Sequence, residues 1–246
     1  MKMKGFISAL TITTIVAYSA TATAITAKSR DASVIRDFTR QLSNPPPSLV
    51  HGGDVCSGTC VGISCDSSGR VTSINRQGLV RDFDPLDILF LSALEILELS
   101  GNKLTGAIPS LAGMASLTHL VLNGSGFTLL TYDFFHGLTS LMILQMDNLP
   151  LVPWLIPNAI ADCTALQVFT ASNVSIIGPL PTALTNLKSL TMLWLSYNYL
   201  SGGLPAWLPE LSSLEIIGLN NQMSDVKLSG TIDVFASFKN LRQLWI

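Results

Sequence analysis

The stretch LTMLWLSYNYLSG, residues 190–202, sets its residues in the pattern L-x-x-L-x-L-x-x-N-x-L. The same pattern, strictly or with an apolar substitute, begins at positions 94, 117, 141, 166, 190 and 214. A partial unit precedes these at 71–74, and another begins at Leu241 and is cut off at 244–246. Full units follow one another every 23 to 25 residues. Self-similarity at a fixed period of this length is typical of a repeat architecture.

This period predicts a solenoid in which each turn contributes one short strand, and the strands of neighbouring turns stack side by side. Strand side chains alternate between two faces, so Leu193 and Leu195 are expected to point inward. The equivalent inward leucines of other units are Leu97, Leu99, Leu120 and Leu122. We therefore predict an α/β solenoid of leucine-rich repeats, a right-handed superhelix with a parallel β-sheet on its concave face.

Amphipathic helices with leucine every three or four residues are the alternative to this fold. Helices of that length are excluded because helix-breaking residues recur at constant intervals. These residues are Gly106, Pro109, Pro157, Gly178, Pro181, Gly202 and Pro205. In a solenoid, by contrast, the ninth position of each unit (Asn102, Asn198) is expected to turn inward and bond the backbone. Other residues stand at this position elsewhere, so we expect an incomplete asparagine ladder: Ser125, Leu149, Val174 and Gln222.

The chain begins with a charged start, an apolar run from Phe6 to about Ala20, and small residues after it. This layout predicts a secretory signal peptide over residues 1–24. A transmembrane anchor is the alternative, but the apolar run is shorter than the ~20 residues that a span needs. An exported chain can carry N-linked sugar at two sequons, Asn123-Gly-Ser and Asn173-Val-Ser.

Composition narrows the classes of function. Charged residues make up 12% of the chain and the formal net charge is −2, without a cluster of lysine or arginine. These values argue against a nucleic-acid partner. The three histidines lie in different units, without cysteine or carboxylate at ligand spacing. No catalytic, cofactor-binding or metal-ligating set is predicted, and we expect a binding protein rather than an enzyme.

The repeat register predicts where binding occurs. The third and fifth residues of each unit point out of the sheet, which puts Met192 and Trp194 on the same exposed face. Tyr197 follows in the same unit, and Trp245 occupies the position of Trp194 two units on. Exposed aromatic patches mark interaction surfaces, so these four residues are the candidate binding surface. The alternative is that further chain covers them or that they are merely tolerated. Glycans on Asn123 and Asn173 are expected to hinder units two and four and leave the C-terminal units to a ligand.

Three units continue as L-x-G-x-[IL]-P or its close equivalent after the strand, as at Leu104–Pro109. This extension resembles the plant-specific repeat subtype, which implies a second short strand and a 3₁₀ segment on the outer side of each turn. From about Asp31 onward the chain resembles plant receptor-like kinases of the transmembrane-kinase (TMK) family. The specific segments are LNNQ at 219–222 and LSGTID at 228–233, within a unit lengthened to 27 residues.

The resemblance implies the extracellular portion of a membrane-anchored receptor serine/threonine kinase, with a role in auxin-related cell-surface signalling. It implies an extracellular protein, peptide or small-molecule ligand and a co-receptor, at the plasma membrane or in the apoplast. Because the chain stops inside a repeat and lacks a kinase, we expect a fragment, a truncated gene model or a degenerate copy. The alternative function is that of a secreted repeat protein, either a decoy or one similar to polygalacturonase inhibitors.

Three of the four cysteines fall in CSGTCVGISC, residues 56–65. Three cysteines do not close a tetrahedral zinc site. Plant repeat receptors open with a helical cap ending in C-x-W-x-x-[VI]-x-C, which resembles this stretch, although Cys60 occupies the tryptophan position. The resemblance implies a Cys56–Cys65 bridge that leaves Cys60 outside it, with Cys163 as a buried thiol. It also implies a cap over 25–70, with a helix over 32–42 ended by three prolines at 45–47, and repeats over 71–246.

Overall fold

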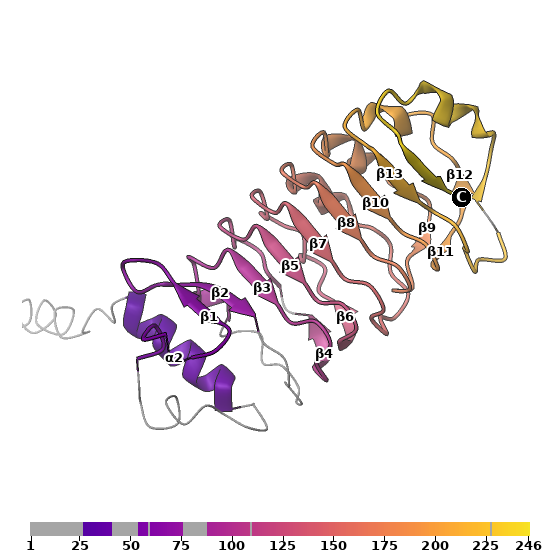
Figure 1. The fold of residues 1–246 in the computed structure, drawn as a ribbon. Coiled ribbons are helices and arrows are strands. Elements are labelled where there is room, and N and C mark those ends of the chain that lie inside the picture. Colours follow the sequence, from indigo (N-terminus) through magenta and orange to yellow (C-terminus); the bar gives the residue numbers. More distant parts are fainter. Residues whose placement is uncertain (1–26, 41–53, 59, 76–87, 109, 227) are drawn as a thin grey trace, which may run out of the picture.

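The computed structural model describes residues 27–40, 54–58, 60–75, 88–108, 110–226 and 228–246. The expected signal peptide and the three prolines lie outside the described residues. Within this part of the chain, turns of similar size are stacked along one direction, from an N-terminal helix to the C-terminal strand (Figure 1). Among the described residues, no helix combines the length and the apolar character needed to cross a membrane.

One sheet of nine strands runs the length of the stack, in the order β1-β2-β3-β5-β7-β8-β10-β13-β15. Only β1 pairs antiparallel, with β2, and all later pairs are parallel. The strands are β1 (Ile63–Cys65), β2 (Val71–Asn75), β3 (Ile96–Glu98), β5 (His119–Val121), β7 (Ile143–Gln145), β8 (Val168–Thr170), β10 (Met192–Trp194), β13 (Ile216–Gly218) and β15 (Gln243–Trp245).

The register of this sheet follows the repeat to the residue. Each strand from β3 to β15 begins two residues after the first apolar residue of its unit, and the third position of one unit pairs with the third position of the next. This holds even across the unit of 27 residues, where Ile216 pairs with Gln243. The prediction of a parallel sheet built by equivalent positions is confirmed.

The other side of the stack carries short strands and 3₁₀ helices, as the plant repeat subtype implied, although not every turn has both: within the described residues, the units that begin at 94 and 117 lack a 3₁₀ helix. The strands form three pairs: β4 (Thr105–Ile108) with β6 (Gly126–Leu130), β9 (Ile177–Gly178) with β11 (Tyr199–Leu200), and β12 (Gly202–Gly203) with β14 (Leu228–Ser229). The 3₁₀ helices are η1 (Ile88–Phe90), η2 (Asn158–Asp162), η3 (Thr182–Asn186), η4 (Leu208–Glu210) and η5 (Ile232–Ser237).

The core lies between the sheet and these outer segments. Inward leucines such as Leu193 and Leu195 are fully buried, as predicted. At the ninth position, the Asn198 side chain donates to the carbonyls of Ala171 and Leu195 and accepts from the amides of Val174 and Ile176. These bonds satisfy backbone groups that would otherwise be buried without partners.

The polar ladder is more complete than the asparagine count predicts. Gln222 stands at the ninth position and donates to the carbonyls of Leu195 and Leu219, while its side-chain oxygen accepts from the Leu200 amide. The Ser125 hydroxyl donates to the Leu99 carbonyl at 2.8 Å. Any side chain that reaches the neighbouring carbonyl performs this task, so asparagine is sufficient but not necessary.

The described part of the N-terminal cap contains the helix α2 (Ala27–Arg40). It begins five residues earlier than the expected start at residue 32. Asp31 is fully buried, and its carboxylate accepts hydrogen bonds from Arg70 Nε at 2.8 Å and from the Val71 amide at 3.0 Å. These bonds, with that carboxylate as the main cause, raise the pKa of the Arg70 guanidinium above its usual value. They join the helix to β2 and hold the extra turn in place.

The cysteines are arranged as the family resemblance implied. Cys56 and Cys65 form a disulfide with their Cα atoms 5.7 Å apart, which confirms the predicted bridge. Cys60 is outside this bridge and is buried against the cap core. Cys163 is a fully buried thiol three units away, and burial raises its pKa to about 12. The cysteine-rich stretch therefore closes the cap over the first turn.

Candidate functional site

The candidate site lies on the exposed face of β10, β13 and β15. We call Met192, Trp194, Tyr197 and Trp245 the aromatic face. Met192 and Trp194 are half-buried, whereas Tyr197 and Trp245 are about half exposed, at 51% and 52%. The indole rings of Trp194 and Trp245 lie 6.1 Å apart between centroids and are tilted by 48°. The structure therefore brings the two predicted tryptophans together on the solvent side of the sheet.

A glycine makes this contact possible. Gly218 occupies the equivalent position on β13, between Trp194 on β10 and Trp245 on β15. A Cβ atom at Gly218 would lie 2.8 Å from the Trp194 indole, closer than carbon atoms can approach. Any side chain in the middle unit would therefore displace the ring. The sequence showed this glycine at the aligned position, but not that it seats an aromatic pair.

Tyr197 projects from an unusual backbone conformation. The eighth position of every unit from 94 to 214 has positive φ, and the residues there are Gly101, Gly124, Asn148, Asn173, Tyr197 and Asn221. Glycine and asparagine adopt this left-handed region at low cost, but a bulky side chain does so rarely. Tyr197, with φ of 58°, is the aromatic exception. An observed strain of this kind supports a hypothesis of function for the residue that bears it.

A shallow hollow of about 410 Å³ adjoins the aromatic face. We call it the rim hollow, and its lining residues are Asn148, Ser172, Asn173, Trp194, Tyr197 and Met223. Aromatic rings and a thioether form one side, and amide and hydroxyl groups form the other. This mixture suits a partner that presents both an apolar group and hydrogen-bonding groups.

Met223 joins this site from the lengthened unit. It follows Gln222, in the extra residues between 222 and 228, and its amide donates to the Asn198 carbonyl at 2.6 Å. The side chain is 48% exposed beside Tyr197. Sequence reasoning did not select Met223. The spacing of 27 showed that extra residues were present, but not that they fold back over the preceding unit.

The polar wall of the hollow rests on a network around Asp147. Its carboxylate accepts from the Thr170 hydroxyl at 2.6 Å and from the Ser172 amide at 2.7 Å. The Asp147 amide in turn donates to the side-chain oxygen of Asn123 at 2.7 Å. Three successive turns are thus tied together beneath the rim, which pre-organises the hollow for binding.

The two sequons differ in their surroundings. Asn123 is half-buried and its side-chain oxygen is engaged by the Asp147 amide, as above. Asn173 is exposed, and its Nδ2 donates to Asn148 Oδ1 at 3.1 Å. Asn173 lines the same hollow as Trp194 and Tyr197. A glycan on Asn173 would therefore stand beside the aromatic face.

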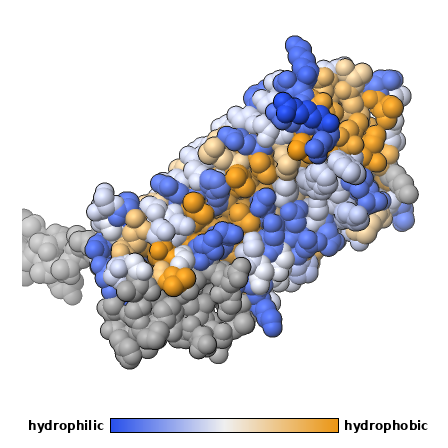
Figure 2. All heavy atoms as spheres, in the orientation of Figure 1, coloured by the Kyte–Doolittle hydropathy of each residue, from blue (hydrophilic) through white to orange (hydrophobic). Residues whose placement is uncertain are grey.

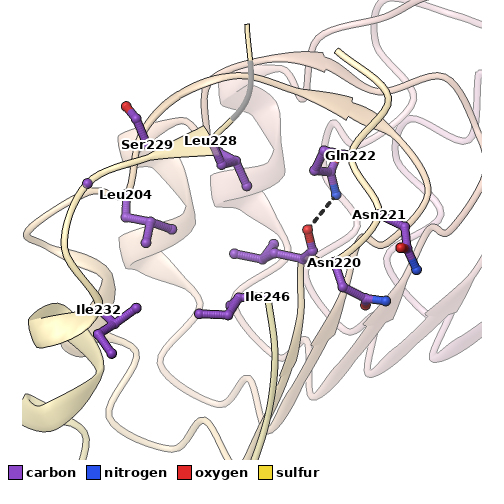
Figure 3. A pocket seen from close by; sticks show the side chains of 10 residues that line it. Leu204, Asn220, Asn221, Gln222, Leu228, Ser229, Ile232 and Ile246 are labelled. Atoms are coloured by element: carbon purple, nitrogen blue, oxygen red, sulfur yellow. Dashed lines mark hydrogen bonds between the residues drawn. The ribbon is translucent and has the colours of Figure 1, made fainter. Parts of the chain in front are cut away.

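Two further hollows have different characters. One, of about 440 Å³, lies beside the last strand of the sheet, where Leu204, Leu228 and Ile246 point into it (Figure 3). The Gln222 amide bonds the Leu219 carbonyl there. Leu219 in its lining is buried, whereas Ile232 and Ile246 are 66% and 56% exposed, so this hollow is open to solvent beside the last strand. The other, of about 210 Å³, is an aromatic niche on the outer side beside Tyr132 and Trp154, which sequence reasoning missed.

Figure 2 shows where apolar residues reach the surface. They run as a band along the visible side of the stack and broaden toward its C-terminal end. The third positions of the units supply apolar, half-buried side chains along the sheet: Ile96, Ile143, Val168, Met192 and Ile216. The aromatic face continues this row at the C-terminal strands.

The two described histidines each contact a side chain in their own part of the stack. His119 Nδ1 lies 2.8 Å from the Thr118 hydroxyl, and His136 Nδ1 lies 3.0 Å from an Asp162 carboxylate oxygen. These pairs belong to different units. Within the described ranges, no three histidine, cysteine or carboxylate side chains are grouped to hold a metal ion. The geometry presents a surface for binding.

Comparisons with known proteins agree with this fold. The Leucine Rich Repeat family matches residues 93–114 and 189–211. The crystal structure of PEPR1-AtPEP1 superposes with a TM-score of 0.70 at 25% sequence identity, covering 87% of this chain and 31% of that one. The chain is therefore a leucine-rich-repeat protein with the solenoid of plant receptor-kinase ectodomains.

Its curated relatives define the group more closely. The chain is 36% identical over 212 residues to receptor-like kinase TMK2 of Arabidopsis thaliana, covering 84% of this chain and 23% of the relative. It is 48% identical over 164 residues to receptor protein kinase WSS1 of Oryza sativa subsp. japonica, covering 65% and 17%. The chain is thus similar to plant leucine-rich-repeat receptor kinases of the TMK type, and it spans about a fifth of the length of these relatives.

Proposed function

We propose that this chain is a non-catalytic recognition module that binds an extracellular polypeptide ligand or co-receptor through its aromatic face and rim hollow. The observation that carries the proposal is the Trp194–Trp245 pair on the solvent side of the sheet. Solvent-exposed tryptophan and tyrosine contribute most to binding where they cluster, because they bury large areas at low entropic cost.

The relatives support this proposal, since they are receptor kinases whose repeat regions resemble the chain. We also propose that the chain passes through the secretory pathway and acts outside the cell. The auxin-related signalling role belongs to it through the TMK resemblance alone. The rim hollow adds neutral groups only, so we expect a partner segment with an apolar anchor flanked by amide or hydroxyl groups.

The test compares capture of partners from plant extracellular fluid by the wild-type chain and two variants. Replacing both Trp194 and Tyr197 with alanine removes the centre of the aromatic face. Tyr132→Ala removes a tyrosine that is 92% exposed on the outer side and serves as the matched control. A partner that is retained by Tyr132→Ala and lost from the double variant supports the proposal. Equal capture by all three proteins contradicts it.

A further inference from the structure

Asn173 and Tyr197 occupy the same position in successive turns of the solenoid. Both have positive φ, of 56° and 58°, and the Asn173 amide donates to the carbonyl of Ser196, which precedes Tyr197. Adjacent strands of a sheet lie about 4.8 Å apart, so a group attached to one position emerges next to the other. A core glycan of several sugar rings is wider than this spacing.

The side chain of Asn173 is accessible to modification. It is exposed, its sequon is complete, and its Nδ2 donates to Asn148 Oδ1 at 3.1 Å. Glycosylation transfers an oligosaccharide from a lipid-diphosphate donor: Nδ2 forms a bond to sugar C1, the C1–O bond to the diphosphate breaks, and one amide proton leaves. The remaining N–H can still donate a hydrogen bond.

We propose that an N-linked glycan on Asn173 covers the rim hollow and shields Tyr197 and Met223, so that glycosylation of this one asparagine controls access to the aromatic face. The control of partner access rests on the proposed function, whereas the shielding of Tyr197 and Met223 by the glycan does not depend on any partner. Sugar rings present apolar faces and hydroxyl groups, which match the aromatic and amide sides of the hollow. The second sequon lacks this relationship because Asn123 does not line the hollow.

The experiment is hydroxyl-radical footprinting of the secreted chain, read by mass spectrometry and requiring no partner. Ser175→Ala abolishes the sequon and leaves Asn173 with its bond to Asn148. Tyr197 and Met223 are about half exposed in the bare chain. We expect their oxidation to be about threefold slower in the glycosylated protein than in Ser175→Ala, because attached sugar is bulky and covers surface.

Three controls accompany this comparison. Oxidation of Tyr132, on the outer side, should not differ between the two proteins. Asn123→Asp removes the other sequon, retains an oxygen acceptor for the Asp147 amide, and should leave Tyr197 protected. Enzymatic removal of glycans from the folded wild-type protein should reproduce the Ser175→Ala pattern without any substitution.

Equal oxidation of Tyr197 and Met223 in glycosylated and unglycosylated protein would overturn the inference. An intact mass that shows no glycan on Asn173 in a secreted chain would overturn it as well. Neither result concerns the proposed function, because partner capture is measured separately. The two proposals can also fail separately. If footprinting shows that the glycan protects Tyr197 and Met223, but the double variant at Trp194 and Tyr197 still captures partners, the proposed function is contradicted and the shielding stands.

Discussion

The indole rings of Trp194 and Trp245 lie 6.1 Å apart although the two residues belong to units separated by a complete turn. The turn between them contributes Gly218 at the equivalent position. Because Gly218 has no side chain, the two indole rings occupy the surface above three neighbouring strands, β10, β13 and β15. Neither ring is part of the buried core, so the pairing serves the surface of the sheet.

Gly218→Ala tests this relationship. The added Cβ atom would lie 2.8 Å from the Trp194 ring, so the ring must move and the pair must separate. We expect a loss of about 1–3 kcal/mol in the free energy of unfolding, as for overpacked sites, together with a changed near-ultraviolet circular dichroism signal. Gly203→Ala is the matched control, because a Cβ atom there meets nothing within 4 Å. An unchanged tryptophan signal in Gly218→Ala would contradict the pairing.

Tyr197→Asn separates stability from binding. Asparagine tolerates the left-handed conformation that costs tyrosine about 1 kcal/mol, so the variant should be as stable as the wild type or more stable by up to that amount. The same variant should bind partners less well, because the exposed ring is lost. Urea unfolding and partner capture give the two readings.

Tyr199→Gln provides the control for this comparison, because asparagine at this position would complete a glycosylation sequon with Ser201. Tyr199 is also exposed and lies two residues away, on β11, but it is not among the residues with positive φ. We expect no gain in stability there. If Tyr197→Asn is destabilising and Tyr199→Gln is not, the ring of Tyr197 contributes packing that outweighs its backbone strain.

Sequence alone predicts the sheet of this protein well, because one pattern fixes both the strand and its partner. The apolar residue that opens a unit sets the start of the strand two residues later, so Ile216 and Gln243 pair correctly despite the longer spacing. The inward leucines and the outward tryptophans follow from the same alternation. In a repeat protein each strand pairs with the strand of the next unit, so the position of a residue within its unit is enough to predict its partner.

The parts that sequence missed depend on contacts between distant segments. Nothing local indicates that α2 begins at Ala27, since its first four residues are exposed and the buried bond of Asp31 is made to Arg70, 39 residues away. Met223 reaches the rim hollow because its amide bonds the preceding unit at Asn198. Gln222 substitutes for asparagine only because its longer side chain spans to Leu195. Each of these requires the geometry of two turns together.

Asp31→Asn tests the attachment of the cap. The Arg70 guanidinium and the Val71 amide both donate to the Asp31 carboxylate, and removing its charge takes the main counter-ion from the partly buried Arg70. We expect a loss of about 3 kcal/mol, at the lower end for a broken buried pair because Arg70 is 20% exposed. Hydrogen exchange of β2 and thermal unfolding give the measurement.

Lys28→Ala is the control for the cap experiment. Lys28 pairs with Asp54 at 3.4 Å, but both side chains are 51% exposed. Water screens such a pair, so thermal unfolding should be unchanged. If the two variants were equally stable, the buried carboxylate would not hold the helix to β2.

The buried thiol of Cys163 should make the free energy of unfolding depend on pH in the alkaline range. Burial is the main cause that raises the pKa of this thiol, from 9.0 to about 12, with the nearby Asp162 charge adding to it. The folded protein therefore keeps its proton where the unfolded chain loses it. The resulting contribution to stability is fully present below about pH 9 and is lost progressively as pH rises toward 12, at up to about 1.4 kcal/mol per pH unit.

Urea unfolding at pH 8 and pH 10.5 should show this decline in the wild-type protein. Cys163→Ala should show a smaller decline, even though this variant is less stable than the wild type at pH 8. At pH 8, iodoacetamide should label Cys163 only after unfolding. Rapid labelling of the folded protein, or the same pH slope in Cys163→Ala, would show that this thiol is not sealed in the core.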